Sequence, residues 1–171
     1  MIGAPAGSVN APAADATMRP MRIQIAADVS ALAIAAADAI CDAVRAKPDA
    51  ALGLPTGNTP VATYAELRKR EAASAISFAA ATAWAIDEFA DATRDTPGTN
   101  SVFYREHLRI VLRALHVPNP GAHDPQEHIV AFADALRRAG GLDLCVLGIG
   151  RNGHVAFNEP GSAVDAPARV V

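Results

Sequence analysis

Residues 142–160 read LDLCVLGIGRNGHVAFNEP, a short hydrophobic run that passes directly into a glycine-rich polar loop. The run Leu142–Leu147 predicts a buried strand, because short apolar runs bounded by turn residues are typical of strands covered on both faces. The loop places His154 and Glu159 among glycines, which permit sharp turns and close approach of a ligand to the backbone. This strand end is therefore a candidate site.

Upstream of this loop, the chain alternates apolar runs with helical patterns. We expect strands at Arg22–Ala26, Ala50–Leu54, Phe78–Ile86 and Leu142–Leu147, and helices from Asp28 or Ser30 to about Ala46, Pro60 to about Ala72, about Asn100 to Leu115, and Asp124-Pro125 to Gly140-Gly141. This alternation predicts an α/β fold, a Rossmann-like three-layer sandwich with a mostly parallel sheet. In such sheets, ligands bind beyond the carboxyl ends of the strands.

Length and composition limit the class of protein. The chain has 171 residues, 51% of them hydrophobic, with a net charge of −3 and no basic cluster that predicts a nucleic acid or membrane partner. Residues 1–20 predict a disordered lead-in without signal-peptide character, so we expect one domain over residues 21–171 and a cytoplasmic location. Cys41 and Cys145 lie in apolar contexts and are expected to be reduced core thiols.

A second strand end carries the turn Pro55-Thr56-Gly57-Asn58-Thr59, which precedes a helix beginning at Pro60. Main-chain N–H groups at a helix start and the hydroxyls of Thr56 and Thr59 could together hold a phosphate group. The alternative is structural: Thr59 caps the helix and Pro60 occupies its first position.

A third strand end carries Asp87 and Glu88. A carboxylate that leaves an apolar strand is partly desolvated, which raises its pKa and suits it to accept a proton, although it could instead cap a loop or helix. His154 is five residues from Glu159, and a carboxylate beside an imidazole would fix its tautomer. The other histidines, His107, His116, His123 and His128, are expected in solvated helical or loop positions.

The motifs LGLPTGNTP, AIDEF and LGIGRNGHVAFNEPG, in this order and spacing, closely resemble the glucosamine-6-phosphate deaminase family. The resemblance covers roughly Arg22 to Ser162. The related 6-phosphogluconolactonases typically follow Gly-His with a Ser-Leu-Phe-Pro-Gly-like run, which the present Phe-Asn-Glu-Pro does not match. The resemblance implies conversion of glucosamine 6-phosphate and water to fructose 6-phosphate and ammonia, without a metal or organic cofactor.

The resemblance also implies roles for single residues. Gly57, Asn58 and Thr59 would hold the phosphate, and Asn58 stands where many relatives have Gly or Ser. Asp87 would move the proton between C2 and C1 of the sugar through an enediol-type intermediate, after which the C2 imine hydrolyses.

His154 would open the pyranose ring, with Glu159 and Asn152 completing that group. Position 152 is Asp in one branch of the family and Asn in another. An amide cannot take a proton, so Asn152 can only orient its neighbours or form hydrogen bonds.

Family members continue beyond the last motif with further strands and with basic side chains for the phosphate. This chain ends at Ala168–Val171, so we expect a sheet incomplete at the C-terminus and the N-terminal portion of a longer domain. Two alternatives stay open, a phosphogluconolactonase-like hydrolase and a non-catalytic sugar-phosphate-binding remnant, as does assembly into a homo-oligomer.

Overall fold

The computed structural model describes residues 21–171, so the lead-in predicted for residues 1–20 lies outside the described residues. At its centre is a four-stranded sheet in the order β3-β2-β1-β4, in which all neighbouring strands are parallel. The strands are β1 (Ala51–Leu54), β2 (Thr82–Ala85), β3 (Ala114–His116) and β4 (Leu144–Cys145). The predicted α/β fold with a parallel sheet is confirmed.

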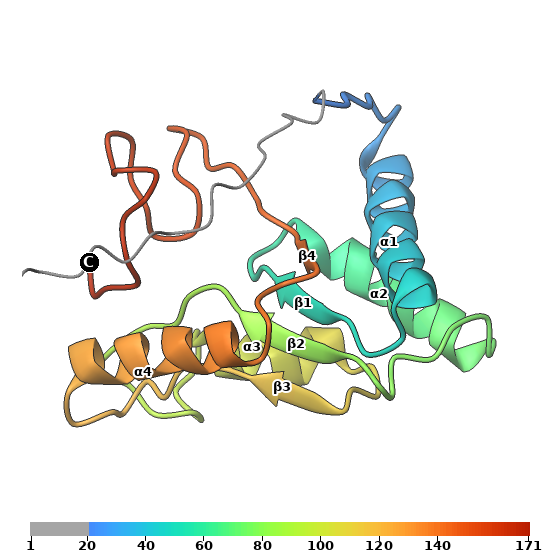
Figure 1. Cartoon of the computed structure of the whole chain (residues 1–171). Coiled ribbons are helices and arrows are strands. Elements are labelled where there is room, and N and C mark those ends of the chain that lie inside the picture. The colour runs from blue at the N-terminus through green and yellow to red at the C-terminus, as the bar shows by residue number, and fades with distance from the viewer. Residues whose placement is uncertain (1–20) are drawn as a thin grey trace, which may run out of the picture.

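Helices cover both faces of the sheet, which gives three layers (Figure 1). On one face, α1 (Val29–Ala46) and α2 (Pro60–Ala72) pack against each other. On the other face lies α4 (Pro125–Arg138), whose Phe132 ring meets the Trp84 ring of β2 edge-on, with centroids 5.4 Å apart. This arrangement leaves the carboxyl ends of the strands open for a site.

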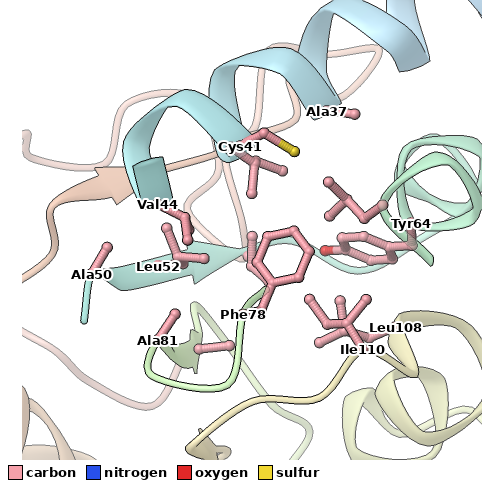
Figure 2. Close-up of a cluster of buried hydrophobic side chains, with 14 of the residues drawn as sticks. Ala37, Cys41, Val44, Ala50, Leu52, Tyr64, Phe78, Ala81, Leu108 and Ile110 are labelled. Atoms are coloured by element: carbon pink, nitrogen blue, oxygen red, sulfur yellow. The ribbon is translucent and has the colours of Figure 1, made fainter. Parts of the chain in front are cut away.

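The hydrophobic core lies on the α1 and α2 face of the sheet (Figure 2). Because side chains alternate along a strand, Leu52 of β1 points into this core while Gly53 faces the α4 side. Small residues along α1, among them Ala37 and Cys41, are fully buried against the core, which lets the helix lie close to the sheet. Cys41 is therefore a core thiol as predicted, but Cys145 is exposed and that prediction is wrong.

Helix starts follow the local signals in the sequence. The Asp28 carboxylate accepts from the N–H of Ala31 at 2.7 Å and caps α1, and Asp124 caps α4 in the same way. Pro60 occupies the first turn of α2, where a missing N–H costs nothing. These three helices begin and end within a residue or two of their predicted limits.

The helix predicted from Asn100 to Leu115 is wrong in its second half. Helix α3 (Asn100–Phe103) continues as a single π-helical segment, η1 (Tyr104–Leu108), and stops at Arg109, whose φ of 45° is left-handed. The chain then runs to β3, which pairs with β2. Hydrogen bonding to the free edge of β2 outweighs the helical pattern here, and it places His116 in a strand, stacked 3.9 Å from Trp84.

The strand predicted at Arg22–Ala26 is absent, and β2 and β4 are shorter than predicted. Ile23 and Ile25 are 78% and 92% exposed, and no strand within residues 21–171 pairs with them. A β-branched run forms a strand only where a neighbouring strand supplies hydrogen bonds, and the alternating pattern does not reveal that neighbour.

Gly53 packs directly against β4. A Cβ atom at this position would lie 2.8 Å from both Cys145 Sγ and Leu142 Cδ1, closer than nonbonded atoms approach. We expect Gly53→Ala to lower the free energy of unfolding by about 1–3 kcal/mol, measured by urea denaturation. Adding Cys145→Ala removes one of the two clashes and should restore part of that loss. If Gly53→Ala alone is as stable as the parent, β4 must move aside without a loss in the free energy of unfolding.

Candidate active site

The ends of β1, β2 and β4 meet at one cavity of about 250 Å³. Its wall includes Pro55 and Thr56 after β1, Asp87 after β2, and Gly150 and His154 after β4. Parallel strands bring their carboxyl ends to the same edge of a sheet, so residues far apart in sequence become neighbours. The structure thus gathers side chains from all three sequence motifs.

The turn after β1 has the backbone of a binding loop. Gly57 adopts φ +98°, a conformation that other residues rarely adopt. The structural alternative is confirmed for Pro60, which begins α2, but Thr59 at the N-cap position forms no side-chain capping hydrogen bond, so that part of the alternative is wrong. Gly57, Asn58 and Thr59 are exposed beside the cavity rather than part of its wall.

Two buried tyrosines hold the strand end that carries this turn. The Tyr104 hydroxyl donates to the Leu54 carbonyl and the Tyr64 hydroxyl to the Pro55 carbonyl, each at 2.5 Å. Burial raises the pKa of both phenols, so both stay protonated and remain donors. Neither tyrosine could be recognised from the sequence as a site residue, because its helical context gives no sign of a partner at the end of β1.

The acidic pair after β2 divides into two roles. The Glu88 carboxylate accepts from the N–H groups of Asn100 and Ser101 at 2.9 and 2.8 Å and from the Ser101 hydroxyl, so it fixes the start of α3. Asp87 instead lines the cavity. Capping thus accounts for Glu88 and leaves Asp87 available to a ligand.

Asp87 is a half-buried carboxylate with one strong donor. Burial, followed by the charge of Glu88, raises its pKa, and the hydrogen bond from Asn100 works against both. That bond joins Asn100 Nδ2 to Asp87 Oδ1 at 2.6 Å. From the sequence, Asn100 was predicted only as a helix start, because local patterns do not encode its contact with Asp87.

His154 is held by the loop itself. Its main-chain carbonyl accepts from the N–H of Gly150 at 2.8 Å, and the imidazole ring lies over the Cα atom of Gly150. A side chain at position 150 would overlap the ring, so glycine is required by close approach. The Gly153 turn, with φ +94°, returns the chain to this position.

The sequence suggested a direct contact between His154 and Glu159, but in the structure the side chain of Asn152 lies between them. Asn152 Nδ2 donates to Glu159 Oε2 at 2.6 Å, and Asn152 Oδ1 lies 2.7 Å from His154 Nδ1. Since a carboxylate only accepts, the amide nitrogen must face Glu159 and its oxygen must face the ring. His154 Nδ1 therefore carries a proton, and Nε2 of the neutral ring is an acceptor.

A second cavity of about 610 Å³ adjoins the first and shares Asp87 and Phe157 with it. Glu159 lines this cavity, as does the C-terminal segment 166–171. The Phe89 and Phe157 rings lie 5.1 Å apart, centroid to centroid, where the loops after β2 and β4 meet. The two cavities together leave room for a ligand larger than a phosphate ion.

No group of three or more His, Cys, Asp or Glu side chains within residues 21–171 is arranged to hold a metal ion. Among the same residues, none of the helices has the length and apolar character needed to cross a membrane.

Curated relatives of this chain are glucosamine-6-phosphate deaminases. Glucosamine-6-phosphate deaminase 2 of Bacillus subtilis (strain 168) is 39% identical over 155 residues, which cover 88% of this chain and 62% of that protein. The glucosamine-6-phosphate deaminase of Mycolicibacterium smegmatis is 38% identical over 154 residues, covering 88% of this chain and 59% of that protein. The chain thus spans about three fifths of the length of these relatives.

Solved structures match the fold in the same way. A monomeric glucosamine-6-phosphate deaminase superposes with a TM-score of 0.81 at 31% identity, covering 85% of this chain and 62% of that one. A 6-phosphogluconolactonase from Shewanella baltica superposes with a TM-score of 0.62 at 22% identity, covering 75% and 56%, and shares the fold. A family model described as glucosamine-6-phosphate isomerases/6-phosphogluconolactonase matches residues 25–164. The chain belongs to this family.

Proposed function

We propose that this protein is an amino-sugar phosphate deaminase, which converts glucosamine 6-phosphate and water to fructose 6-phosphate and ammonia. The observation that carries the proposal is the convergence of Asp87 and His154 on one cavity beside the turn after β1. Its nearest rival, hydrolysis of a phosphogluconolactone, falls under the same family description, but the matching lactonase structure from Shewanella baltica is 22% identical and supports the fold alone.

The substrate phosphate would bind at the turn Thr56–Thr59. Gly57 is left-handed and exposed, and the Thr59 hydroxyl forms no capping hydrogen bond with α2. The N-terminal dipole of α2 adds partial positive charge at the same point.

His154 would open the pyranose ring, because ring opening takes a proton from the anomeric hydroxyl and returns one to the ring oxygen. In the neutral ring, Nε2 is the atom able to accept that proton. The imidazolium that forms is stabilised through Asn152 by the negative charge of Glu159, which needs no proton transfer through the amide.

Asp87 would then take the proton from C2 of the open-chain sugar and return it to C1. Its raised pKa makes the carboxylate a stronger base than an exposed aspartate. The product of this transfer is a C2 imine, and water converts it to the ketone as ammonia leaves.

Domain extent, location, cofactor and partner belong to the same proposed function. We propose that residues 21–171 form the N-terminal portion of a longer sugar-phosphate domain, which acts in the cytoplasm without a cofactor and takes a phosphosugar as partner. Sedimentation of the purified chain tests its assembly into a homo-oligomer.

The proposal is tested by incubating the protein with glucosamine 6-phosphate and measuring ammonia and fructose 6-phosphate in equal amounts. Galactosamine and mannosamine 6-phosphates test the choice of amino sugar, and 6-phosphogluconolactone tests the rival. We expect ammonia release from glucosamine 6-phosphate and no lactone hydrolysis above the spontaneous rate. Hydrolysis of the lactone without ammonia release would reverse the assignment, and tight binding without turnover would favour the non-catalytic alternative.

A further inference from the structure

Asn100 links two of the three parts of the proposed site. It is 5% exposed, and both ends of its amide are engaged. Nδ2 lies 2.6 Å from Asp87 Oδ1 and 3.0 Å from the Asp87 carbonyl oxygen. Oδ1 lies 2.9 Å from the Thr56 hydroxyl. One buried side chain thus contacts both the predicted base and the turn predicted to hold the phosphate.

The chemistry of the neighbours fixes how this amide is oriented. The carboxylate and the carbonyl of Asp87 are both acceptors, so the amide nitrogen must face them. The amide oxygen then faces Thr56, whose hydroxyl must donate its proton to Asn100. Reversing the amide would place its oxygen against the two acceptor oxygens of Asp87, and buried acceptors in contact without a proton between them are costly.

We propose that Asn100 is a positioning residue that couples the turn after β1 to Asp87 and designates Asp87 Oδ2 as the oxygen that takes the substrate proton. The inference rests on the proposed function. Oδ1 is occupied by the Asn100 amide, and no hydrogen bond from within residues 21–171 occupies Oδ2. Thr56 in turn acts by holding Asn100 through its hydroxyl.

The main chain of Asn100 is itself held in place. The Glu88 carboxylate binds the N–H groups of Asn100 and Ser101, so the residue next to the base fixes the start of α3. Asn100 therefore has little freedom to follow Asp87 if the carboxylate moves. A rigid donor on a predicted base restricts it to one reactive orientation, and a misplacement of about 1 Å can cost roughly 100-fold in rate.

Several titratable groups surround Asp87, and the hydrogen bond from Asn100 opposes the two largest influences on the pKa of its carboxyl group. Burial and the Glu88 charge raise the pKa of Asp87, while the bond from Asn100 lowers it. The other titratable groups that face the carboxylate, beneath it or across the two cavities, are Tyr104, His154, His128, Glu159 and Arg169. Removing the Asn100 amide should therefore raise the pH at which Asp87 ionises.

The test replaces Asn100 with leucine, which keeps the branched shape of the side chain and removes all three hydrogen bonds of the amide. The Asp87 carboxyl carbon is followed by NMR across a pH titration, and kcat and KM for glucosamine 6-phosphate are measured in parallel. We expect the Asn100→Leu titration to move to higher pH and kcat to fall about 10- to 100-fold, more than KM changes. Thr56→Val removes only the turn-side bond and should give a smaller change in the same direction.

Ser101→Ala is the matched control. It removes a hydrogen bond at the same helix start, to Glu88, without touching Asp87 or Thr56, and should leave the Asp87 titration unchanged. An Asp87 titration unaltered in folded Asn100→Leu would overturn the inference, as would an equal shift in Ser101→Ala. If leucine prevents folding, Asn100→Ser, which shortens the donor, replaces it under the same criteria. The titration needs no turnover, so a parent that releases no ammonia contradicts the proposed function but leaves this test intact.

Discussion

Replacing Asp87 with asparagine is expected to lower the rate of ammonia release by about 10²–10⁴-fold, the usual cost of losing a general base. The amide keeps the shape of the side chain, and its oxygen can still accept from Asn100 Nδ2. It cannot take a proton from C2. The affinity for glucosamine 6-phosphate, measured by calorimetry, should stay close to that of the parent, because the predicted phosphate contacts lie on another strand end.

The pH dependence of ammonia release is a second measurement of the role of Asp87. Proton abstraction needs ionised Asp87, so activity is lost as the pH falls through its raised pKa, above the range of an exposed aspartate. The residual activity of Asp87→Asn should lack this acidic limb. The control is Asp91→Asn, because Asp91 is an exposed residue in the same loop. Its rate of ammonia release should have the pH dependence of the parent. If Asp87→Asn retains activity within a few-fold of the parent, Asp87 is not the base.

Much of the site could be predicted because the sequence marks strand ends with glycine and proline. Gly57 and Pro60 set the turn after β1 and the start of α2, and both lie where predicted. Parallel pairing then brings Thr56, Asp87 and His154 to one edge, a consequence of topology alone. Their chemical roles stay predictions.

The remaining features depend on contacts that local patterns do not encode. Strand β3 has three residues and exists because β2 offers a free edge, so a helical pattern concealed it. Asn100 reaches Thr56 and Asp87 only in the folded chain. The order Glu159, Asn152, His154 likewise depends on the turn at Gly153, which places the amide between the two ionisable groups.

Replacing Gly150 with alanine is expected to reduce ammonia release about as much as removing His154, by roughly 10²–10⁴-fold. A Cβ at this position would overlap ring atoms Cε1, Nδ1 and Nε2 of His154. The backbone cannot easily yield, because Gly150 N–H donates to the His154 carbonyl and Gly153 N–H to the Gly150 carbonyl. The ring must therefore move, which breaks its contact with Asn152.

Gly148→Ala separates this steric effect from a general loss of loop flexibility. Gly148 lines the same cavity, yet a Cβ there would meet no atom within 4 Å. Both variants should unfold at urea concentrations close to that of the parent, while only Gly150→Ala should alter the NMR chemical shifts of the His154 ring. Parent-like turnover by Gly150→Ala would mean that the imidazole works from another position. The Asn152–Glu159 pair would then have no part in setting its tautomer, and the proposed ring-opening role would lose its geometric basis.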